Sequence, residues 1–422
     1  MDEIINGFTG FAKKDGGFTM PKNAKTPEGT VVAYGAQELA DIDDRDRRWS
    51  WVEIDLNAVK HNTQAIRSRI GNGRRLLAVV KSDAYGHGAV RCAKASLTAG
   101  ADWLGVSTVN EGIELRKAGL NAPILILAEP PMEAIPLLLS YRITPAVFHP
   151  EFAIAYGEAA DRHGMRAPFH LAVNTGMNRI GVRHDEVLDF MQQVAFHRAL
   201  DLEGTFTHFA TADCEETFDF KIQVRRFTEA INAMKASGIN PGIVHAANSA
   251  AIIRYPETHF DMVRLGLSLY GFHPCKETRR LVRLHPAMTV KARITEVKTV
   301  PMSEGVSYGM HYRSPGSVKI CTLPVGYADG YRRGLSGRVS VVLGGRRFPQ
   351  VGNICMDQCM FEVDLRSQGG LKRIDPRIGD IVTLVGAEGD AFVTIDEQAD
   401  ICNTIQHEIA IGYSLRMPRY WF

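Results

Sequence analysis

The sequence predicts an α/β fold, a (β/α)₈ barrel of the TIM type followed by a C-terminal, mainly antiparallel β domain. Between residues 76 and 271, short apolar runs alternate with longer segments of helical pattern. Strands joined by such long crossovers pair in parallel, and eight strand–helix units suit a closed barrel better than an open doubly wound sheet. After residue 285 the apolar runs are separated only by Gly, Pro and Ser turns, which favours antiparallel pairing.

The individual elements follow from the same pattern. The expected barrel strands span 76–81, 103–107, 124–128, 143–148, 169–174, 202–209, 243–248 and 262–271, and the expected helices span 89–99, 111–118, 150–163, 185–197 and 218–237. In the β domain the expected strands span 290–300, 318–323, 339–343, 360–363 and 381–385. A capping box from Thr394 to Glu397 predicts one late helix running toward His407. The alternating run 51–56 is expected to pair with the C-terminal domain.

Length and composition indicate a globular chain of two domains with an extension. The chain has 422 residues, of which 45% are hydrophobic and 23% charged, enough for a sizeable core. We expect an N-terminal extension over 1–45, the barrel over 46–285 and the β domain over 286–422. The extension reads as a loosely ordered surface arm, or as a segment that packs on a partner subunit. The net charge of +2 gives no electrostatic case for nucleic acid or an anionic membrane.

Cysteine usage and the lack of long apolar segments favour a cytoplasmic protein. The seven cysteines are odd in number and widely spread, which does not suggest a disulfide framework. Cys355 and Cys359 have no second pair of ligands near them, so we expect no metal site. No run of about 18 apolar residues predicts a membrane span. The first twenty residues lack the apolar segment of a secretory signal.

Lys81 is the first residue that points to chemistry. It ends the apolar run that begins at Leu76. A cation at the end of a buried strand must face a partner, because an unpaired buried charge is costly. Desolvation lowers the pKa of a lysine and turns its amine into a nucleophile for a carbonyl, which is Schiff-base chemistry.

Further polar groups lie at the ends of the later strands or, for Arg264, within the apolar run of the last strand, at the barrel end where active sites form. In chain order they are His208, Asn248, Ser249 and Arg264. The loops after the last two strands are the usual phosphate seat of such barrels, and Ser249 with the backbone of Gly266 and Leu267 suits one. Singly, a strand-end lysine is most often solvated and a strand-end histidine is most often a satisfied hydrogen-bonding group. Together, a lysine, a phosphate cradle and a charged partner for a ring nitrogen describe pyridoxal phosphate.

The segment AVVKSDAYGHG around Lys81 resembles the pyridoxal-binding motif of alanine racemases. The resemblance extends from about Trp51 to Tyr420 and includes FTHFATAD, AANSAA, VRLGLSLYG, GVSYG, VGYADGYRR and VGNICMDQ. It implies an eight-stranded α/β barrel with a C-terminal β domain, in agreement with the pattern above. It also implies pyridoxal 5′-phosphate as cofactor, a small amino acid as substrate, and a homodimer that interconverts L- and D-alanine and supplies D-alanine for peptidoglycan.

The resemblance further implies two bases on opposite faces of the substrate. Lys81 would hold the cofactor and serve one face, and Tyr308 from the other subunit would serve the second face, giving composite sites. His208 would hydrogen-bond Tyr308, since a tyrosine with a pKa near 10 is a poor base without help. The residues implied to hold the cofactor are Lys81, Tyr85, Asn248, Ser249, Arg264, Gly266, Leu267 and His407. Those implied to bind substrate are Arg179, Tyr327 and the backbone at Met356.

The chemistry of Arg264 determines the protonation of the cofactor's pyridine nitrogen. An arginine is effectively always charged, so it donates to the pyridine nitrogen and keeps that nitrogen unprotonated. The cofactor is then a weaker electron sink, which limits transamination and suits a reaction that needs only brief loss of the α-proton.

Three positions depart from the family pattern. Ala172 stands where a carbamylated lysine would orient Arg179, Asn174 replaces an aspartate, and His407 replaces a tyrosine. A bound anion such as chloride, or water, would then have to position Arg179. The substitutions in the segment around Ala172 are similar to those of broad-specificity racemases, which are the main alternative.

Other classes remain as alternatives. A non-catalytic carrier of pyridoxal phosphate would not need the C-terminal domain with Tyr308. A decarboxylase of the same fold would lack that tyrosine base. A nicotinamide dehydrogenase is suggested only by Gly86-His87-Gly88 after a strand, and Arg91 occupies its third glycine position.

Overall fold

The computed structural model describes residues 13–14, 17–18, 43–366 and 373–422. Contacts divide the chain into two units, Met1–Arg47 and Arg48–Phe422. Within the first unit, β1 (Lys13–Lys14) pairs antiparallel with β2 (Gly17–Phe18), and α2 spans Asp44–Arg47. The predicted extension 1–45 lies largely outside the described residues.

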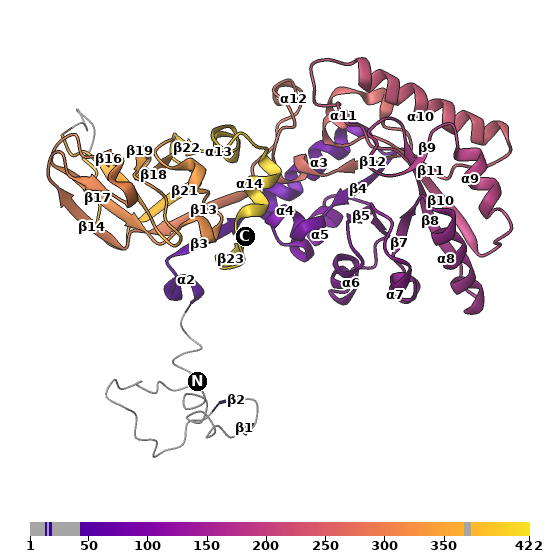
Figure 1. Cartoon of the computed structure of the whole chain (residues 1–422), viewed down its shortest axis with the longest axis horizontal. Coiled ribbons are helices and arrows are strands. Elements are labelled where there is room, and N and C mark those ends of the chain that lie inside the picture. Colours follow the sequence, from indigo (N-terminus) through magenta and orange to yellow (C-terminus); the bar gives the residue numbers. More distant parts are fainter. Residues whose placement is uncertain (1–12, 15–16, 19–42, 367–372) are drawn as a thin grey trace. The chain divides into compact units, whose positions relative to one another are not determined.

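Eight parallel strands close into a barrel in the second unit, which confirms the predicted fold class (Figure 1). The strands are β4 (Arg75–Val79), β5 (Trp103–Val106), β6 (Ile124–Ile126), β7 (Thr144–Val147), β8 (Ala167–Asn174), β10 (Leu200–Phe206), β11 (Ile243–His245) and β12 (Met262–Leu265). Pairing of β8 with β10 and of β12 with β4 completes the ring. A short strand, β9 (Val182–Arg183), extends β8. The position of Gly105 in β5 leaves no room for a side chain, because a Cβ there would lie 2.5 Å from a methyl carbon of Leu77.

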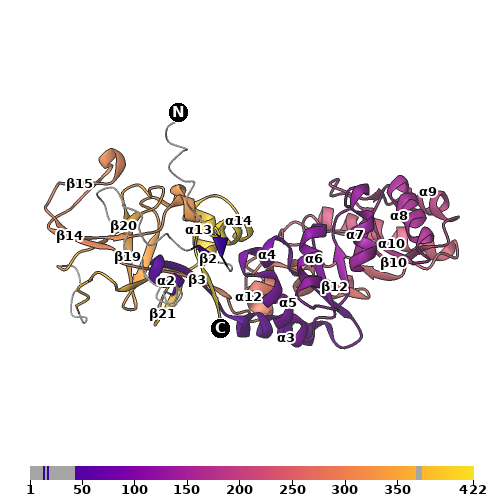
Figure 2. The same cartoon turned by 90° about the horizontal axis from the view of Figure 1, so that it is seen from below.

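Helices surround the barrel strands in both views (Figures 1 and 2). They are α3 (Leu56–Ile70), α4 (Lys81–Gly86), α5 (Ala89–Thr98), α6 (Val109–Lys117), α7 (Ile135–Tyr141), α8 (Pro150–Arg162), α9 (Val187–Val194), α10 (Phe218–Ala236), α11 (Ser249–Arg254) and α12 (Thr278–Leu281). Side-chain caps fix several starts. Asp55 accepts the N–H groups of Asn57 and Ala58 at the start of α3, and Thr108 with Glu111 forms a capping box on α6.

The C-terminal sheet is antiparallel apart from one edge pair. Its strands are β13 (Met288–Arg293), β14 (Glu296–Val300), β17 (Val318–Leu323), β18 (Ser340–Leu343), β19 (Arg346–Val351), β20 (Cys359–Val363), β21 (Ile381–Glu388) and β22 (Ala391–Val393). β3 (Ser50–Ile54) joins it, antiparallel to β13 and parallel to β23 (Arg419–Trp421). A separate hairpin, β15 (Gly305–Val306) with β16 (Tyr312–Arg313), encloses Tyr308.

Three element predictions were wrong in detail. The run 290–300 forms two strands, β13 and β14. The strand expected to reach residue 271 ends at Leu265, and Leu267–Tyr270 forms a 3₁₀ turn. The late helix is two helices, α13 (Ile395–Ile401) and α14 (Gln406–Gly412), because Asn403 takes a left-handed φ of 51° and Ile405 is extended.

The barrel and the C-terminal sheet share one continuous apolar core. α14 lies against α4 in both views, so that the end of the chain reaches the barrel mouth (Figures 1 and 2). Gly86 permits this approach, because a Cβ on it would lie 2.8 Å from the carbonyl oxygen of Ala410. In the described part of the chain, no helix is long and apolar enough to cross a membrane.

Candidate active site

A cavity of about 780 Å³ opens at the C-terminal ends of the barrel strands. Most of the predicted site residues line it, namely Lys81, Tyr85, Arg179, His208, Asn248, Ser249, Arg264, Gly266, Leu267 and His407. They come from five strand ends and from α14, and the fold brings them together although they span more than 300 positions of sequence. The volume is that of a typical small-molecule site.

Tyr308, Tyr327 and Met356 do not line this cavity. They lie on the β domain with their side chains 75%, 43% and 54% exposed. The expected contribution of Tyr308 to the site of another subunit, and the expected contacts of Tyr327 and Met356 with substrate, stay predictions.

The turn after Lys81 has an unusual backbone. Ser82, Asp83, Ala84 and Tyr85 have φ between 50° and 55°, a left-handed turn that disfavours side chains. Tertiary contacts hold it. The carboxylate of Glu111, which also caps α6, accepts the N–H of Ser82 at 2.7 Å.

Lys81 projects from this turn into a positively charged cavity. Burial lowers the pKa of Lys81, the nearby Arg179 lowers it further, and Glu111 opposes both. The ammonium group makes no hydrogen bond or ion pair with any residue that the structure describes. A lysine of lowered pKa and no partner is more readily available as a free amine.

Arg264 is buried on the barrel side of the cavity and is hydrogen-bonded through both of its Nη groups. It donates to the carbonyls of Thr207 and Ala246 at 2.7 and 2.9 Å. It also donates to Nδ1 of His245 at 2.9 Å and to Nδ1 of His208 at 3.1 Å. Burial lowers the pKa of Arg264 to about 9, so it remains charged at neutral pH.

These bonds fix the tautomers of the neighbouring histidines. Arginine can only donate, so Nδ1 of both His208 and His245 carries no proton and the proton resides on Nε2. His245 Nε2 lies 2.8 Å from Nδ1 of His170, whose Nε2 in turn lies 3.6 Å from Glu203. Burial and the charge of Arg264 lower the pKa of His208 to about 3. His208 therefore presents a neutral Nε2–H donor.

The hydroxyls of Tyr85 and Ser249 form a pair of donors beside the open space at Gly266. Burial raises the pKa of Tyr85 to about 12, so its hydroxyl stays protonated. A Cβ on Gly266 would lie 2.9 Å from that hydroxyl, so the glycine keeps the space between them open. The Ser249 hydroxyl accepts N–H groups of Gly266 and Ser268, both at 3.2 Å, which leaves its own proton free to donate. Asn248 caps α11 by accepting the N–H of Ala251.

His407 faces Tyr85, with ring centroids 5.4 Å apart. Its Nδ1 is buried and has no hydrogen-bond partner among the described residues. Burial lowers the pKa of His407, as does Lys81, while Asp213 raises it.

On the opposite side of the cavity, no described residue holds the Arg179 side chain in place. Its side chain is exposed and has no hydrogen bond or ion pair within the described ranges. Asn174 does not reach it, because the Asn174 side chain accepts N–H groups of Gly176 and Asn178 and donates to the Asn178 side chain. The Ala172 side chain is too short to orient Arg179 as the carbamylated lysine expected at this position would. Lys81, Arg179 and Arg264 thus leave the cavity with an excess of positive charge.

Sequence reasoning missed several residues that organise this cavity. His170 and His245 lie within apolar strands, where a polar residue on the barrel interior is the signal that could have indicated them. Glu111 could have been found only as a capping-box residue, and no local pattern indicates its bond to Ser82.

On the β domain, the loop around Tyr308 is held by its neighbours. The Asn353 side chain donates to the Tyr308 carbonyl at 2.7 Å, and the Ser307 hydroxyl donates to the Asn353 carbonyl at 2.7 Å. The backbone of Tyr308 is thereby anchored while its side chain stays exposed.

Stability should fall with acid because of His87, which lies just after the left-handed turn. Its Nδ1 donates to the carbonyls of Ala84 and Tyr85, and its buried Nε2 has no partner, so burial lowers the pKa to about 4. Below about pH 6.5, His87 is protonated in the unfolded chain but stays neutral in the folded chain, so acid favours unfolding. We expect a loss of about 2 kcal/mol in the free energy of unfolding between about pH 7.5 and pH 5.

Urea denaturation at several pH values measures this loss. In His87→Gln the slope of stability against pH should become shallower over that interval. An unchanged slope would contradict the assignment, whatever the absolute stability of the variant.

Comparison with protein families places the cavity in context. The family model described as alanine racemase, N-terminal domain, matches residues 54–274, and that described as alanine racemase, C-terminal domain, matches residues 287–421. A protein of Carboxydothermus hydrogenoformans named alanine racemase is 42% identical over 88% of this chain and 99% of its own length. One of Nostoc with the same name is 40% identical over 88% of this chain and 95% of its length.

Solved structures of racemases are also similar to this chain. The alanine racemase of Bacillus anthracis with bound L-Ala-P superposes with a TM-score of 0.82 at 36% identity, covering 89% of this chain and 95% of that one. The histidine racemase of Leuconostoc mesenteroides superposes with a TM-score of 0.79 at 28% identity, covering 89% and 98%.

Proposed function

This chain belongs to the alanine racemase family, and we propose that it interconverts L- and D-alanine with pyridoxal 5′-phosphate as its cofactor. The observation that carries the proposal is the meeting of three groups in one cavity. Lys81 supplies an amine of lowered pKa, Arg264 supplies a charged donor, and the hydroxyls of Tyr85 and Ser249 supply neutral donors beside Gly266.

The cavity fits this cofactor in charge and shape. The space kept by Gly266, the protonated Tyr85 hydroxyl and the free Ser249 proton suit a phosphate, joined by the unpartnered Nδ1 of His407. Arg264 would face the ring nitrogen and Lys81 the aldehyde carbon. When bound, the cofactor stabilises the electron pair left by removal of the substrate α-proton.

The residues of this chain would move that proton. The amine of Lys81 would take or return it on one face of the substrate. The phenol of Tyr308, supplied by a second copy of the chain, would do so on the other. The Nε2–H of His208, fixed by Arg264, would donate to the Tyr308 oxygen and stabilise its deprotonated form. Arg179 and the backbone at Met356 would bind the substrate carboxylate, and Tyr327 would also contact the substrate.

The assembly and setting follow from this proposal. The exposure of Tyr308, Tyr327 and Met356 supports a homodimer in which each β domain completes the cavity of the other subunit. We place the enzyme in the cytoplasm, where D-alanine would feed peptidoglycan synthesis.

A broad-specificity amino-acid racemase is the second candidate. Ala172 leaves the carboxylate side of the cavity without a fixed anion, and His407 takes the place of a larger tyrosine. The histidine racemase named above shows that this fold accommodates a bulkier substrate in another protein.

A direct assay tests both candidates. Purified protein loaded with pyridoxal phosphate is given L-alanine, L-serine, L-lysine, L-arginine or L-histidine, and formation of each D-isomer is followed by chiral chromatography. A kcat/KM for alanine far above the others supports the first candidate, and comparable values support the second. Absence of racemisation with every substrate would refute both.

Chloride should assist substrate binding at Arg179. An anion beside the guanidinium would offset the excess positive charge and hold the side chain in place. We expect KM for L-alanine to fall by roughly two- to fivefold when chloride replaces gluconate at constant ionic strength. Arg179→Gln should lose this response, and a KM independent of chloride in the wild type would contradict the anion.

A further inference from the structure

We propose that a chain of alternating charges, Arg48–Asp329–Arg416–Asp357, positions the loops that present Tyr327 and Met356. The inference rests on the proposed function, in which those two residues bind substrate in the neighbouring subunit. Asp329 is its central residue. None of the four charged side chains is expected to touch substrate, so each acts through the loops.

Asp329 closes the turn that carries Tyr327. Its Oδ2 accepts the N–H of Gly326 at 3.0 Å, and its own N–H donates back to the Gly326 carbonyl at 3.0 Å. These reciprocal bonds tie the two ends of the Tyr327–Asp329 turn together. The orientation of Tyr327 is therefore set by where Asp329 is held.

The same turn is joined to the loop that carries Met356. The N–H of Tyr327 donates to the Cys355 carbonyl and the N–H of Ala328 donates to the Met356 carbonyl, both at 3.0 Å. Gly326 makes this contact possible, because a Cβ there would lie 2.3 Å from both carbonyl oxygens. The two predicted substrate-binding residues thus belong to one packed unit.

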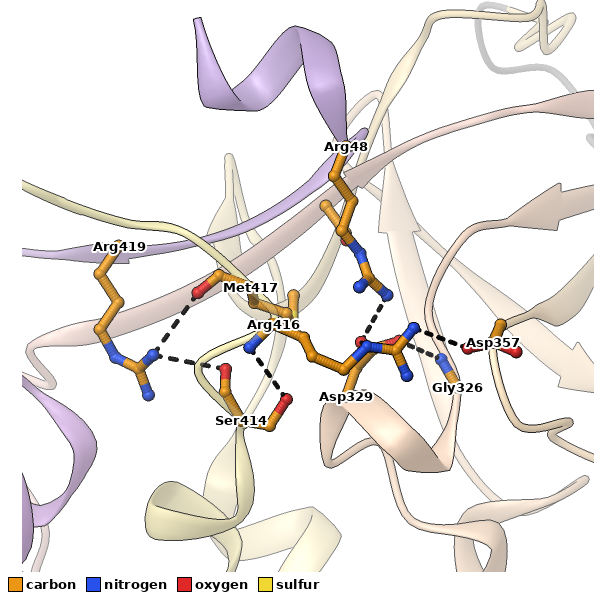
Figure 3. Close-up of polar contacts among 9 residues, drawn as sticks. Arg48, Gly326, Asp329, Asp357, Ser414, Arg416, Met417 and Arg419 are labelled. Carbon is orange, nitrogen blue, oxygen red and sulfur yellow. Dashed lines mark hydrogen bonds and ion pairs between the residues drawn. The ribbon is translucent and has the colours of Figure 1, made fainter. Parts of the chain in front are cut away.

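Two arginines from distant parts of the chain hold the Asp329 carboxylate (Figure 3). Arg48 donates to its Oδ1, and Nε of Arg416 lies 3.6 Å from the same oxygen. Asp329 is fully buried, so these cations are what make its charge tolerable. The Ser414 N–H donates to the Asp329 carbonyl at 3.0 Å, which fixes the Arg416 segment against the turn.

Arg416 also reaches the second loop. Its Nη2 lies 2.7 Å from Oδ1 of Asp357, the residue after Met356 (Figure 3). One guanidinium therefore links the Tyr327 turn with the Met356 loop. Tyr327 and Met356 gain fixed positions from this link while their side chains stay exposed, as residues that serve a neighbouring subunit must.

Arg416→Gln tests the proposal in the full-length holoenzyme, because Arg48 still pairs with Asp329 in that variant and the fold should survive. We expect roughly tenfold faster hydrogen–deuterium exchange at the Tyr327 and Ala328 amides, since loosening the loops opens those bonds. KM for L-alanine should rise about three- to tenfold, with kcat within about twofold of wild type. Arg416→Lys should have an intermediate effect on amide exchange and on KM, because lysine keeps the positive charge but lacks the planar guanidinium.

Arg347→Gln is the matched control. It removes an ion pair with Glu397 in the same β domain, and Arg347 is about as exposed as Arg416. It should leave exchange at 326–328 and KM unchanged. Asp357→Asn should give part of the effect of Arg416→Gln, because it breaks the link to the Met356 loop but leaves the pair between Arg416 and Asp329. The double variant should be no worse than Arg416→Gln alone, because that change already removes the link to Asp357.

The outcomes separate this proposal from the proposed function. Unchanged amide exchange in Arg416→Gln, or an equal increase in Arg347→Gln, would overturn the positioning role whether or not the enzyme racemises alanine. Faster exchange in Arg416→Gln alone, with no racemase activity in the wild type, would support the positioning role and refute the function.

Discussion

Replacement of Lys81 by alanine should abolish racemisation, with kcat/KM for alanine falling by roughly 10⁴-fold or more, because one side chain would serve as both cofactor anchor and base. Burial and the nearby Arg179 lower the pKa of this amine, and among the described residues no other lysine lines the cavity to replace it. Borohydride reduction followed by mass spectrometry should attach the mass of the reduced cofactor to the wild-type chain and not to Lys81→Ala.

A matched control is Lys94→Ala. Lys94 is exposed on α5, outside the cavity lining, and its loss should leave both activity and covalent attachment unchanged. If Lys81→Ala retained activity and covalent cofactor, the central assignment of the site would be refuted.

The barrel could be predicted because its strands are short, apolar and separated by crossovers of helical length. α3 was missed because polar residues interrupt its buried face. The Asn62 side chain donates to the carbonyls of Leu269 and His285, and the Thr63 hydroxyl donates to that of Val59. The long-range bonds of Asn62 and the bond of Thr63 within α3 make these positions suitable for burial, and a hydrophobic pattern does not record such bonds.

The sequence indicated the side chains Lys81 and Arg264 but not the backbone conformation that orients Lys81. Lys81 followed from an apolar run ending in a cation and from a motif, and Arg264 from an arginine within an apolar strand. The left-handed turn that aims Lys81 was not predictable, because four residues with side chains adopt φ values that local preferences oppose. Contacts from Glu111 and α14, remote in sequence, help to stabilise it, together with the His87 ring, which donates to the carbonyls of Ala84 and Tyr85.

Tyr308, Tyr327 and Met356 came from resemblance alone. They lie in three separate loops with no shared pattern, and their common surface is apparent only in the fold. The bonds that fix them, from Asn353 to the Tyr308 carbonyl and from Asp329 to the Tyr327 turn, involve residue types that are frequent in any loop.

Tyr308→Phe should slow racemisation by roughly 10²- to 10⁴-fold, because the phenol oxygen is the proposed base on one face of the substrate. The loss should be unequal. Exchange of the α-deuteron of one alanine enantiomer, the one whose α-proton faces Lys81, should persist, while exchange from the other should nearly cease. NMR measurement of α-deuterium loss from each enantiomer distinguishes the two faces, and equal loss would count against two bases.

Mixing two inactive variants gives the sharpest test of the composite site. In a dimer of one Lys81→Ala chain and one Tyr308→Phe chain, one cavity lacks both groups and the other has both, provided that Tyr308 serves the neighbouring subunit. Random reassembly makes half the dimers mixed, so activity should recover to about a quarter of wild type. No recovery, with mixed dimers demonstrated by differential tagging, would place both groups in the same chain. The 75% exposure of Tyr308 and its absence from the cavity of its own chain argue for recovery.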